Sequence, residues 1–187
     1  MPERNVDFGK FGAIGIKGHE AVARQLDALA GYIATPVTAQ RGLLARLHYL
    51  TRTDHARAAA RAAGLTVTDR TLEAWLNGKR RPLKKNLEAI EQAYRTVRRE
   101  NVARYLLARL NRGTRVEIHP LNQSQVDRPH QRTVEFRTMN VRHWDQIIAA
   151  WAAGDDQQLD DAWVDKVVDL GSQWGQYEYV TNIGFAA

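Results

Sequence analysis

Apolar residues recur every three or four positions over most of the first 113 residues, the spacing that places side chains on one face of a helix. Residues that begin or end helices separate these runs. The pattern predicts five helices, in residues 19–34, 39–50, 55–64, 69–78 and 83–113. Four of them are preceded by a residue suited to a helix start, namely Thr38, Thr53 or Asp54, Thr68 and Pro82.

The longest run, residues 83–113, repeats apolar residues along its length. Its expected inner face consists of Leu83, Leu87, Ile90, Tyr94, Val97, Val102, Tyr105 and Leu106. In residues 39–50 the expected inner face consists of Leu43, Leu44, Leu47 and Leu50. In residues 69–78 it consists of Leu72, Trp75 and Leu76. Trp75 is therefore expected to be structural.

After Gly113 apolar residues fall at every second position, which is typical of half-buried strands. Strands are predicted at residues 114–119 and 132–138. Their expected inward residues are Val116, Ile118, Val134 and Phe136. A helix capped by Asn140, a second helix over residues 155–171 and a last strand at residues 176–185 complete a β-β-α-α-β pattern.

These elements predict a mainly α protein with a smaller α+β C-terminal module, in which a helical bundle is followed by a long helix. Residues 1–18 are expected to be a flexible arm, marked by glycine at positions 9, 12, 15 and 18. The arm lacks the Gly-Lys-Ser/Thr ending of a phosphate-binding loop. Residues 19–113 are expected to be a basic helical domain, and residues 114–187 an acidic α+β module.

Net charge supports this division. The whole chain carries +6, but residues 1–115 hold 22 basic and 10 acidic side chains, a net charge of +12. Residues 116–187 hold 5 basic and 11 acidic side chains, a net charge of −6. The basic part has the electrostatic footprint of a nucleic-acid-binding protein. The acidic part, with its four tryptophans, is better suited to protein contacts. Residues 19–113 are therefore expected to be a DNA-binding domain, and residues 114–187 a module for assembly or a partner.

The third and fourth predicted helices form a pair joined by a short turn, and the first of the pair is small and rich in alanine. This is the arrangement of a helix-turn-helix, whose second helix enters the major groove of DNA. Arg can pair with guanine, Asn with adenine, and Glu can accept from cytosine. The expected base-reading residues are Thr68, Asp69, Arg70, Glu73 and Asn77.

Five cationic side chains follow within residues 79–85, more than a solvated helix end requires. They are expected to anchor the phosphate backbone beside the reading helix. The expected phosphate-binding residues are Arg57, Arg61, Lys79, Arg80, Arg81, Lys84 and Lys85. The alternative is an ordinary antiparallel helix pair with a solvated basic end.

The segment "VTDRTLEAWLNGKRRPLKKNLEAI" resembles the second helix of phage-repressor-type helix-turn-helix domains, which often run Thr-hydrophobic-x-x-Trp-Leu-x-Gly-Lys-Arg-Arg-Pro. Over residues 40–180 the layout also resembles the telomere terminal proteins of linear actinobacterial chromosomes and plasmids, and related proteins of mobile elements. Those proteins likewise place a helix-turn-helix, a basic "RRP" segment, a long helix and a β/α module in this order.

The resemblance implies a role in replication at DNA ends. In that family a hydroxyl side chain is joined covalently to the 5′ end of DNA and primes synthesis. Thr114, in "NRGTRVEI", is the position at which the resemblance suggests such a hydroxyl. A turn residue between a helix and a strand is the other interpretation of Thr114.

Other groupings suggest no further chemistry. The six histidines form no zinc-binding spacing, although His119 and His130 flank a Pro-marked loop, and the acids of residues 155–169 lack the order of a calcium loop. We expect no metal and no cofactor. Trp144, Trp151, Trp163 and Trp174 are expected to be core or interface aromatics.

The absence of cysteine, of a signal-like N-terminus and of a long apolar run favours a cytoplasmic, nucleoid-associated protein with no membrane contact.

Three functions remain open. The first is a non-enzymatic protein that binds specific duplex DNA sites as a regulator or as a terminal-protein-like factor of a replicon or mobile element. The second is a protein primer that carries DNA on a hydroxyl side chain. The third is an adaptor that binds only proteins. In the first two, the C-terminal module is expected to form a homodimer or to bind another replicon protein.

Overall fold

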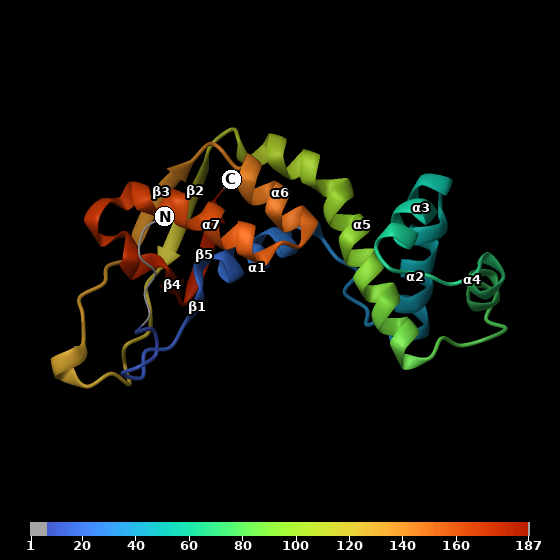
Figure 1. The fold of residues 1–187 in the computed structure, drawn as a ribbon, viewed down its shortest axis with the longest axis horizontal. Coiled ribbons are helices and arrows are strands. Elements are labelled where there is room, and N and C mark those ends of the chain that lie inside the picture. Colours follow the sequence, from blue (N-terminus) through green and yellow to red (C-terminus); the bar gives the residue numbers. More distant parts are fainter. Residues whose placement is uncertain (1–6, 187) are drawn as a thin grey trace. The chain divides into compact units, whose positions relative to one another are not determined.

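The computed structural model describes residues 7–186, except for the side chains of Ser172 and Gln173. The chain forms two compact units: unit 1 comprises residues 1–29 and 103–187, and unit 2 comprises residues 30–102. The fold is mainly α with a smaller α+β part, as the sequence predicts (Figure 1). None of the helices in the described part is long and apolar enough to cross a membrane.

Unit 2 is a helical bundle. It contains α2 (Gln40–Thr51), α3 (Asp54–Ala62), α4 (Asp69–Leu76) and most of α5 (Lys84–Leu110), which continues into unit 1. One apolar core joins all four helices, with buried members Leu43, Leu47, Leu50, Ala60, Leu65, Leu72, Trp75, Ile90, Ala93, Tyr94 and Val97. The predicted inner faces of the second and fourth helices are confirmed at Leu47, Leu72 and Trp75.

Unit 1 contains α1 (Gly18–Ala30), α6 (Asp145–Ala153), α7 (Asp156–Val167) and two small antiparallel sheets. The larger sheet has the order β3-β2-β5, from Arg137–Val141, Thr114–His119 and Asn182–Ala186. The smaller one pairs β1 (Ile16–Lys17) with β4 (Tyr179–Val180). Short 3-10 helices lie at η1 (Arg128–His130) and η2 (Val168–Tyr177). Trp144, Trp151 and Trp163 are fully buried, so the expectation of core aromatics is confirmed for these three.

The division into units differs from the predicted boundaries at residues 18 and 113. Helix α1 belongs to unit 1, where it packs against both α6 and α7 (Figure 1). The indole nitrogen of Trp151 donates to Asp27 Oδ1 at 2.8 Å. His19 Nδ1 lies 2.7 Å from Asp160 Oδ1. These bonds join residues more than 120 positions apart, which helical periodicity cannot reveal.

The predicted flexible arm is partly a packed strand. Residues 1–6 lie outside the described part, but Ile16 and Lys17 form β1, and Ile14 bridges to Asn122. A Cβ on Gly15 would overlap Leu121 and the carbonyl of Val180, and one on Gly18 would overlap the Trp163 ring. These glycines are needed for close packing and not for flexibility, so the prediction was wrong for residues 14–18.

The second predicted strand is shifted along the chain. It was placed at residues 132–138, whereas β3 spans Arg137–Val141 and pairs Val141 with Thr114. Val116 and Ile118 of β2 are buried as expected, but Phe136 is 46% exposed and meets His119 edge-on. Apolar and polar residues alternate similarly in residues 132–138 and 137–141. Only the pairing with β2 therefore selects which residues form the strand.

Three other predicted boundaries were wrong. Thr38 does not cap the second helix, because α2 begins after Ala39, which makes no side-chain cap bond. Asn140 lies in β3, and Asn111 Oδ1 instead accepts from the backbone nitrogen of Trp144 at the start of α6. The last predicted strand is divided into β4 and β5 at Thr181, whose backbone nitrogen and hydroxyl donate to the carbonyl oxygen of His119.

The inner face of the long helix was predicted correctly at Ile90, Tyr94, Val97 and Leu106, all of which are buried. Leu83 and Tyr105 are 63% and 65% exposed and depart from it. Leu83 precedes the first residue of α5. Tyr105 lies where α5 has passed from unit 2 into unit 1, so the buried stripe need not continue unchanged.

A buried cation lies within unit 2. The side chain of Arg46, on the inner side of α2, is 4% exposed. Its Nε donates to Glu91 Oε2 on α5 at 2.5 Å, and its Nη1 donates to the carbonyl oxygens of Thr35 and Gly42 at 2.8 and 3.0 Å. Its Nη2 donates to the carbonyl oxygen of Ile33 at 3.1 Å. Arg46 thereby joins α2, α5 and the segment before α2.

We predict that Arg46→Ala lowers the free energy of unfolding by about 3–5 kcal/mol, because it removes the donor to Glu91 Oε2 and the side-chain donors to three carbonyl oxygens, and leaves Glu91, among the described residues, only its bond from Arg95. Arg41→Ala, which removes an exposed arginine from the same helix, should change it by less than about 0.5 kcal/mol. Urea titration of both variants measures the difference. Equal stability of the two variants would contradict the structural role of Arg46.

Candidate nucleic-acid interface

Helices α3 and α4 begin at the predicted caps. Thr53 Oγ1 accepts from the backbone nitrogen of Ala56 at 3.1 Å, and Thr68 Oγ1 accepts from that of Thr71 at 3.3 Å. Both caps satisfy amide groups that the first turn of a helix leaves without an intrahelical partner. The first residues of both helices are thus fixed by side-chain caps that can be recognised in the sequence.

The turn after α3 is also well defined. Gly64 has a φ of 98°, and the backbone nitrogen of Leu65 donates to the carbonyl oxygen of Ala60 at 3.0 Å. Together with the bond from the Gly64 nitrogen to the Arg61 carbonyl oxygen, this closes the helix in a Schellman motif. Leu65 is buried in the unit 2 core and secures the turn from inside.

Helix α4 is held in unit 2 by one face. Leu72 and Trp75 are buried, Leu76 is half-buried, and α4 contacts α2. Trp75 is only 2% exposed, which confirms that its ring belongs to the core. An isolated helix of eight residues is not stable in water, so this apolar face is what keeps α4 folded.

The opposite face of α4 points to solvent. Arg70 and Glu73 are exposed on α4 at positions i and i+3, and Asn77, the exposed C-cap residue at i+7, follows on the same side. Within residues 7–186, no hydrogen bond or ion pair occupies these three side chains. They offer a guanidinium, a carboxylate and an amide along one stripe, the groups that read guanine, cytosine and adenine.

The other two predicted base-reading residues are exposed but already engaged. Thr68 uses its hydroxyl as the cap of α4 and also lies 2.9 Å from Thr71 Oγ1. Asp69 Oδ1 accepts from Arg61 Nη2 at 2.6 Å, an exposed ion pair between α4 and α3. Thr68 and Asp69 therefore hold the start of α4 in place, and their side-chain oxygens are used in contacts within the protein.

All seven predicted phosphate-binding residues are exposed. Three have partners in the protein: Arg61 pairs with Asp69, Arg57 Nε donates to the carbonyl oxygen of Thr51, and Arg81 Nη2 donates to that of Thr38. In the described part of the chain, the other four side chains make no hydrogen bond or ion pair. These four are Lys79, Arg80, Lys84 and Lys85.

Two of the four cations, Lys79 and Arg80, directly follow α4, and the other two, Lys84 and Lys85, lie in the first turn of α5. Gly78, with a φ of 67°, ends α4, and the backbone nitrogens of Lys79 and Arg80 both donate to the carbonyl oxygen of Ala74. Pro82 is buried, so the segment is anchored while its charged side chains face water. Counted over unit 2, residues 30–102 hold 14 basic and 6 acidic side chains, a net charge of +8.

Thr114 has a different environment. Its side chain is fully buried at the start of β2, and its hydroxyl donates to the carbonyl oxygen of Leu110 at 3.0 Å. In this conformation it closes the junction between α5 and β2 and presents no accessible oxygen to a DNA end. Linkage of Thr114 to DNA would require that junction to open.

Several histidines and acids outside unit 2 make structural contacts. His119 meets Phe136, and His130 stacks on Phe11, so each ring has a phenylalanine neighbour. Asp155 caps α7, and Asp160 contacts the buried His19. Among residues 7–186, no three His, Asp or Glu side chains gather in a metal-binding arrangement.

Sequence reasoning missed Arg46, which organises unit 2. The signal was present, because position 46 shares the helical face of Leu43, Leu47 and Leu50. A cation on that face indicates a buried partner.

No protein-family model, no curated protein and no solved structure matches this chain.

The position of Thr68 allows capping to be separated from base recognition. Thr68→Ala should lower the free energy of unfolding by about 1 kcal/mol, because it removes the acceptor at the start of α4. Thr68→Ser keeps that acceptor and should retain most of the stability. Thermal unfolding followed by circular dichroism checks both variants, and an equally stable Thr68→Ala variant would contradict the capping role.

Proposed function

We propose that the chain binds duplex DNA through unit 2 and recognises a specific site with α4. The observation that carries this proposal is the exposed stripe of Arg70, Glu73 and Asn77, directly opposite the buried face of the same helix. A helix with one apolar face in a bundle and one hydrogen-bonding face in solvent has the arrangement of a recognition helix.

The cations beside α4 complete the proposal. Lys79 and Arg80 follow α4 directly, and Lys84 and Lys85 begin the next helix. Phosphate contacts from such residues set the affinity and position of a protein on DNA, whereas base contacts set the sequence preference. The net charge of +8 on unit 2 favours approach to the polyanion.

We further propose that unit 1 serves assembly, as a homodimer or with another protein of the same replicon or mobile element. Residues 103–187 and 1–29 together hold 13 basic and 15 acidic side chains, so this unit is nearly neutral and does not share the charge of unit 2. A single eight-residue helix reads few base pairs, and pairing two copies is the usual way to lengthen a site. Such a protein would act at the nucleoid.

The salt dependence of binding tests the phosphate contacts. Replacing Lys79, Arg80 and Lys84 together by Ala should reduce the slope of log K against log[salt] by roughly 2–3, because about 0.9 counterion is released per phosphate contact. The matched control replaces the exposed unit 1 residues Arg24, Arg104 and Arg142, with the same loss of charge. Fluorescence anisotropy with a labelled duplex gives both slopes. Equal slopes for the two triple variants would contradict the proposed DNA face.

Base recognition has a separate test. After a preferred site has been selected from random duplexes, Arg70→Ala and Glu73→Ala should each weaken binding to that site by about 1–3 kcal/mol and leave binding to random DNA almost unchanged. Glu88→Ala, which removes an exposed acid from α5, is the control. Competition binding measures the preference. If Arg70→Ala and Glu73→Ala lose site and random binding equally, α4 is not the reading helix.

A further inference from the structure

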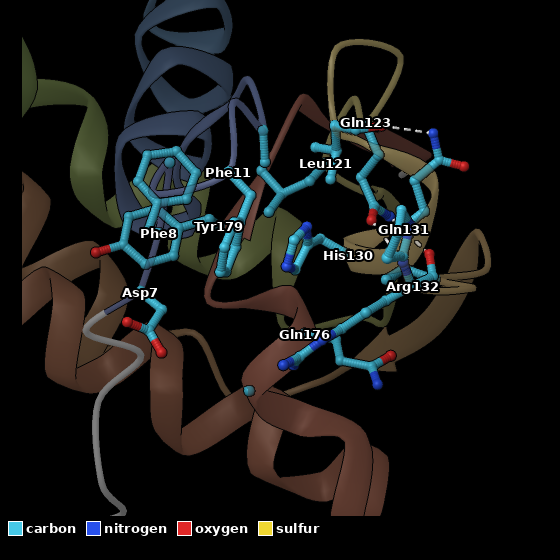
Figure 2. A pocket seen from close by; sticks show the side chains of 16 residues that line it. Asp7, Phe8, Phe11, Leu121, Gln123, His130, Gln131, Arg132, Gln176 and Tyr179 are labelled. Atoms are coloured by element: carbon cyan, nitrogen blue, oxygen red, sulfur yellow. Dashed lines mark hydrogen bonds between the residues drawn. The ribbon is translucent and has the colours of Figure 1, made fainter.

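Unit 1 contains a hollow that duplex binding by unit 2 does not use. Its volume is about 560 Å³, within the range of small-ligand pockets. It is lined by the N-terminal turn, the segment between β2 and β3, and the end of η2 with β4 (Figure 2). All of these segments belong to unit 1.

Two parallel ring stacks border the hollow. Phe8 lies on Tyr179 with ring centroids 3.8 Å apart and planes 3° from parallel. Phe11 lies on His130 at 4.1 Å and 9°. Phe11 is 46% exposed and His130 is exposed, so the second stack stands in solvent. An exposed parallel stack is a surface that another planar ring can extend.

Polar groups face the stacks across the hollow, where Gln123, Gln131 and Arg132 lie opposite Phe8 and Phe11 (Figure 2). The Gln123 amide binds the Arg132 backbone twice, donating to its carbonyl oxygen at 2.7 Å and accepting from its nitrogen at 2.8 Å. Gln131 Nε2 donates to the carbonyl oxygen of Val126 at 2.7 Å. These bonds hold the backbone at Arg132 in place.

Two lining side chains remain open to a ligand. Within the described residues, neither the Arg132 guanidinium nor the Gln176 amide has a hydrogen-bond or ion-pair partner. Asp7, the one carboxylate among the described lining residues, lies 3.4 Å from Lys10 Nζ. An uncommitted guanidinium can bind a phosphate through two parallel bonds, and an amide can both donate to and accept from a base edge.

We propose that this hollow binds a nucleotide unit. The base extends the Phe11–His130 stack, the phosphate pairs with Arg132, and the Gln176 amide contacts the base edge. A purely apolar ligand would leave Arg132 and Gln176 unused, and an anion without a ring would leave the stack unused. The nucleotide is either a free mononucleotide or the unpaired end of a DNA strand. The proposal does not rest on duplex binding by unit 2.

The test uses the full chain and isothermal titration with the four deoxynucleoside monophosphates, and then with a short single strand bearing a 5′ phosphate. At least one monophosphate or the single strand should bind, and ribose 5-phosphate, which has no base, should bind about tenfold more weakly. Tighter binding of the single strand identifies a DNA end as the natural source; tighter binding of a monophosphate identifies a free nucleotide. No binding of either probe, or equal binding of ribose 5-phosphate, would overturn the proposal.

A comparison of two arginine variants tests whether the ligand binds in the hollow. Arg132→Ala should weaken the bound probe by at least about tenfold, and Arg132→Lys should recover part of that loss. Arg128→Ala removes an exposed arginine of the same segment that does not line the hollow, and should change affinity less than about twofold. Equal losses in Arg132→Ala and Arg128→Ala would show a general charge effect and overturn the site. Because Arg132 is exposed, its variants should remain folded, which circular dichroism verifies.

Duplex binding separates this proposal from the function proposed for unit 2. Arg132→Ala should retain the duplex affinity of the native chain. A native chain that binds the nucleotide probe and no duplex would support the hollow and refute the function of unit 2. A parallel loss of duplex and single-strand binding in Arg132→Ala would overturn the hollow as a distinct site.

Discussion

The buried guanidinium of Arg46 is the interaction on which unit 2 depends. A charge removed from water is tolerated only when its donors are satisfied, and here Glu91 and three carbonyl oxygens accept from it. The Tyr94 ring lies beside it, with the guanidinium carbon 5.2 Å from the ring centroid. Because the four acceptors come from α2, α5 and the segment before α2, one side chain sets the distance between two helices and the course of the chain leading into them.

The proposed DNA face follows from that scaffold. Helix α4 is too short to fold alone and rests on α2 through Leu72 and Trp75. The orientation of its exposed residues depends on how firmly α2 is held. In the proposed function, Arg46 therefore supports recognition through α2 and not through a contact with DNA. The Arg61–Asp69 pair and the Thr68 cap then set the entry of α4 from the preceding turn. Side chains near α4 therefore divide into those that position the helix and those left open to a ligand.

Unit 1 is stabilised differently. Three buried tryptophans and the packing of α1 against α6 and α7 form its interior, and the glycines at positions 15 and 18 allow β1 and the start of α1 to approach their neighbours closely. The same N-terminal segment then supplies Phe8 and Phe11 to the hollow. The residues that resembled a loose arm thus contribute both to a sheet and to the ring stacks of the proposed nucleotide site. Each unit thus carries its own proposed ligand surface, one basic and one aromatic.

The sequence by itself determined the features that depend on neighbours within one or two turns. These are the helix segments, the cap at Thr68, the start of α3 at Thr53 or Asp54, the strand β2, the inward Trp75, and the exposure of the basic run after Gly78. Tertiary structure decided the remaining features, because they depend on residues that are far apart in the chain. Pairing with β2 selected residues 137–141 as β3, and contacts across more than 120 residues assigned α1 to unit 1. The tertiary structure also pairs Asp69 with Arg61 and buries the Thr114 hydroxyl against Leu110. Among the described residues, it leaves the side chains of Arg70, Glu73 and Asn77 without hydrogen-bond or ion-pair partners. Periodicity shows which face of an element is buried, but only packing shows what that face meets and which polar groups remain free to bind.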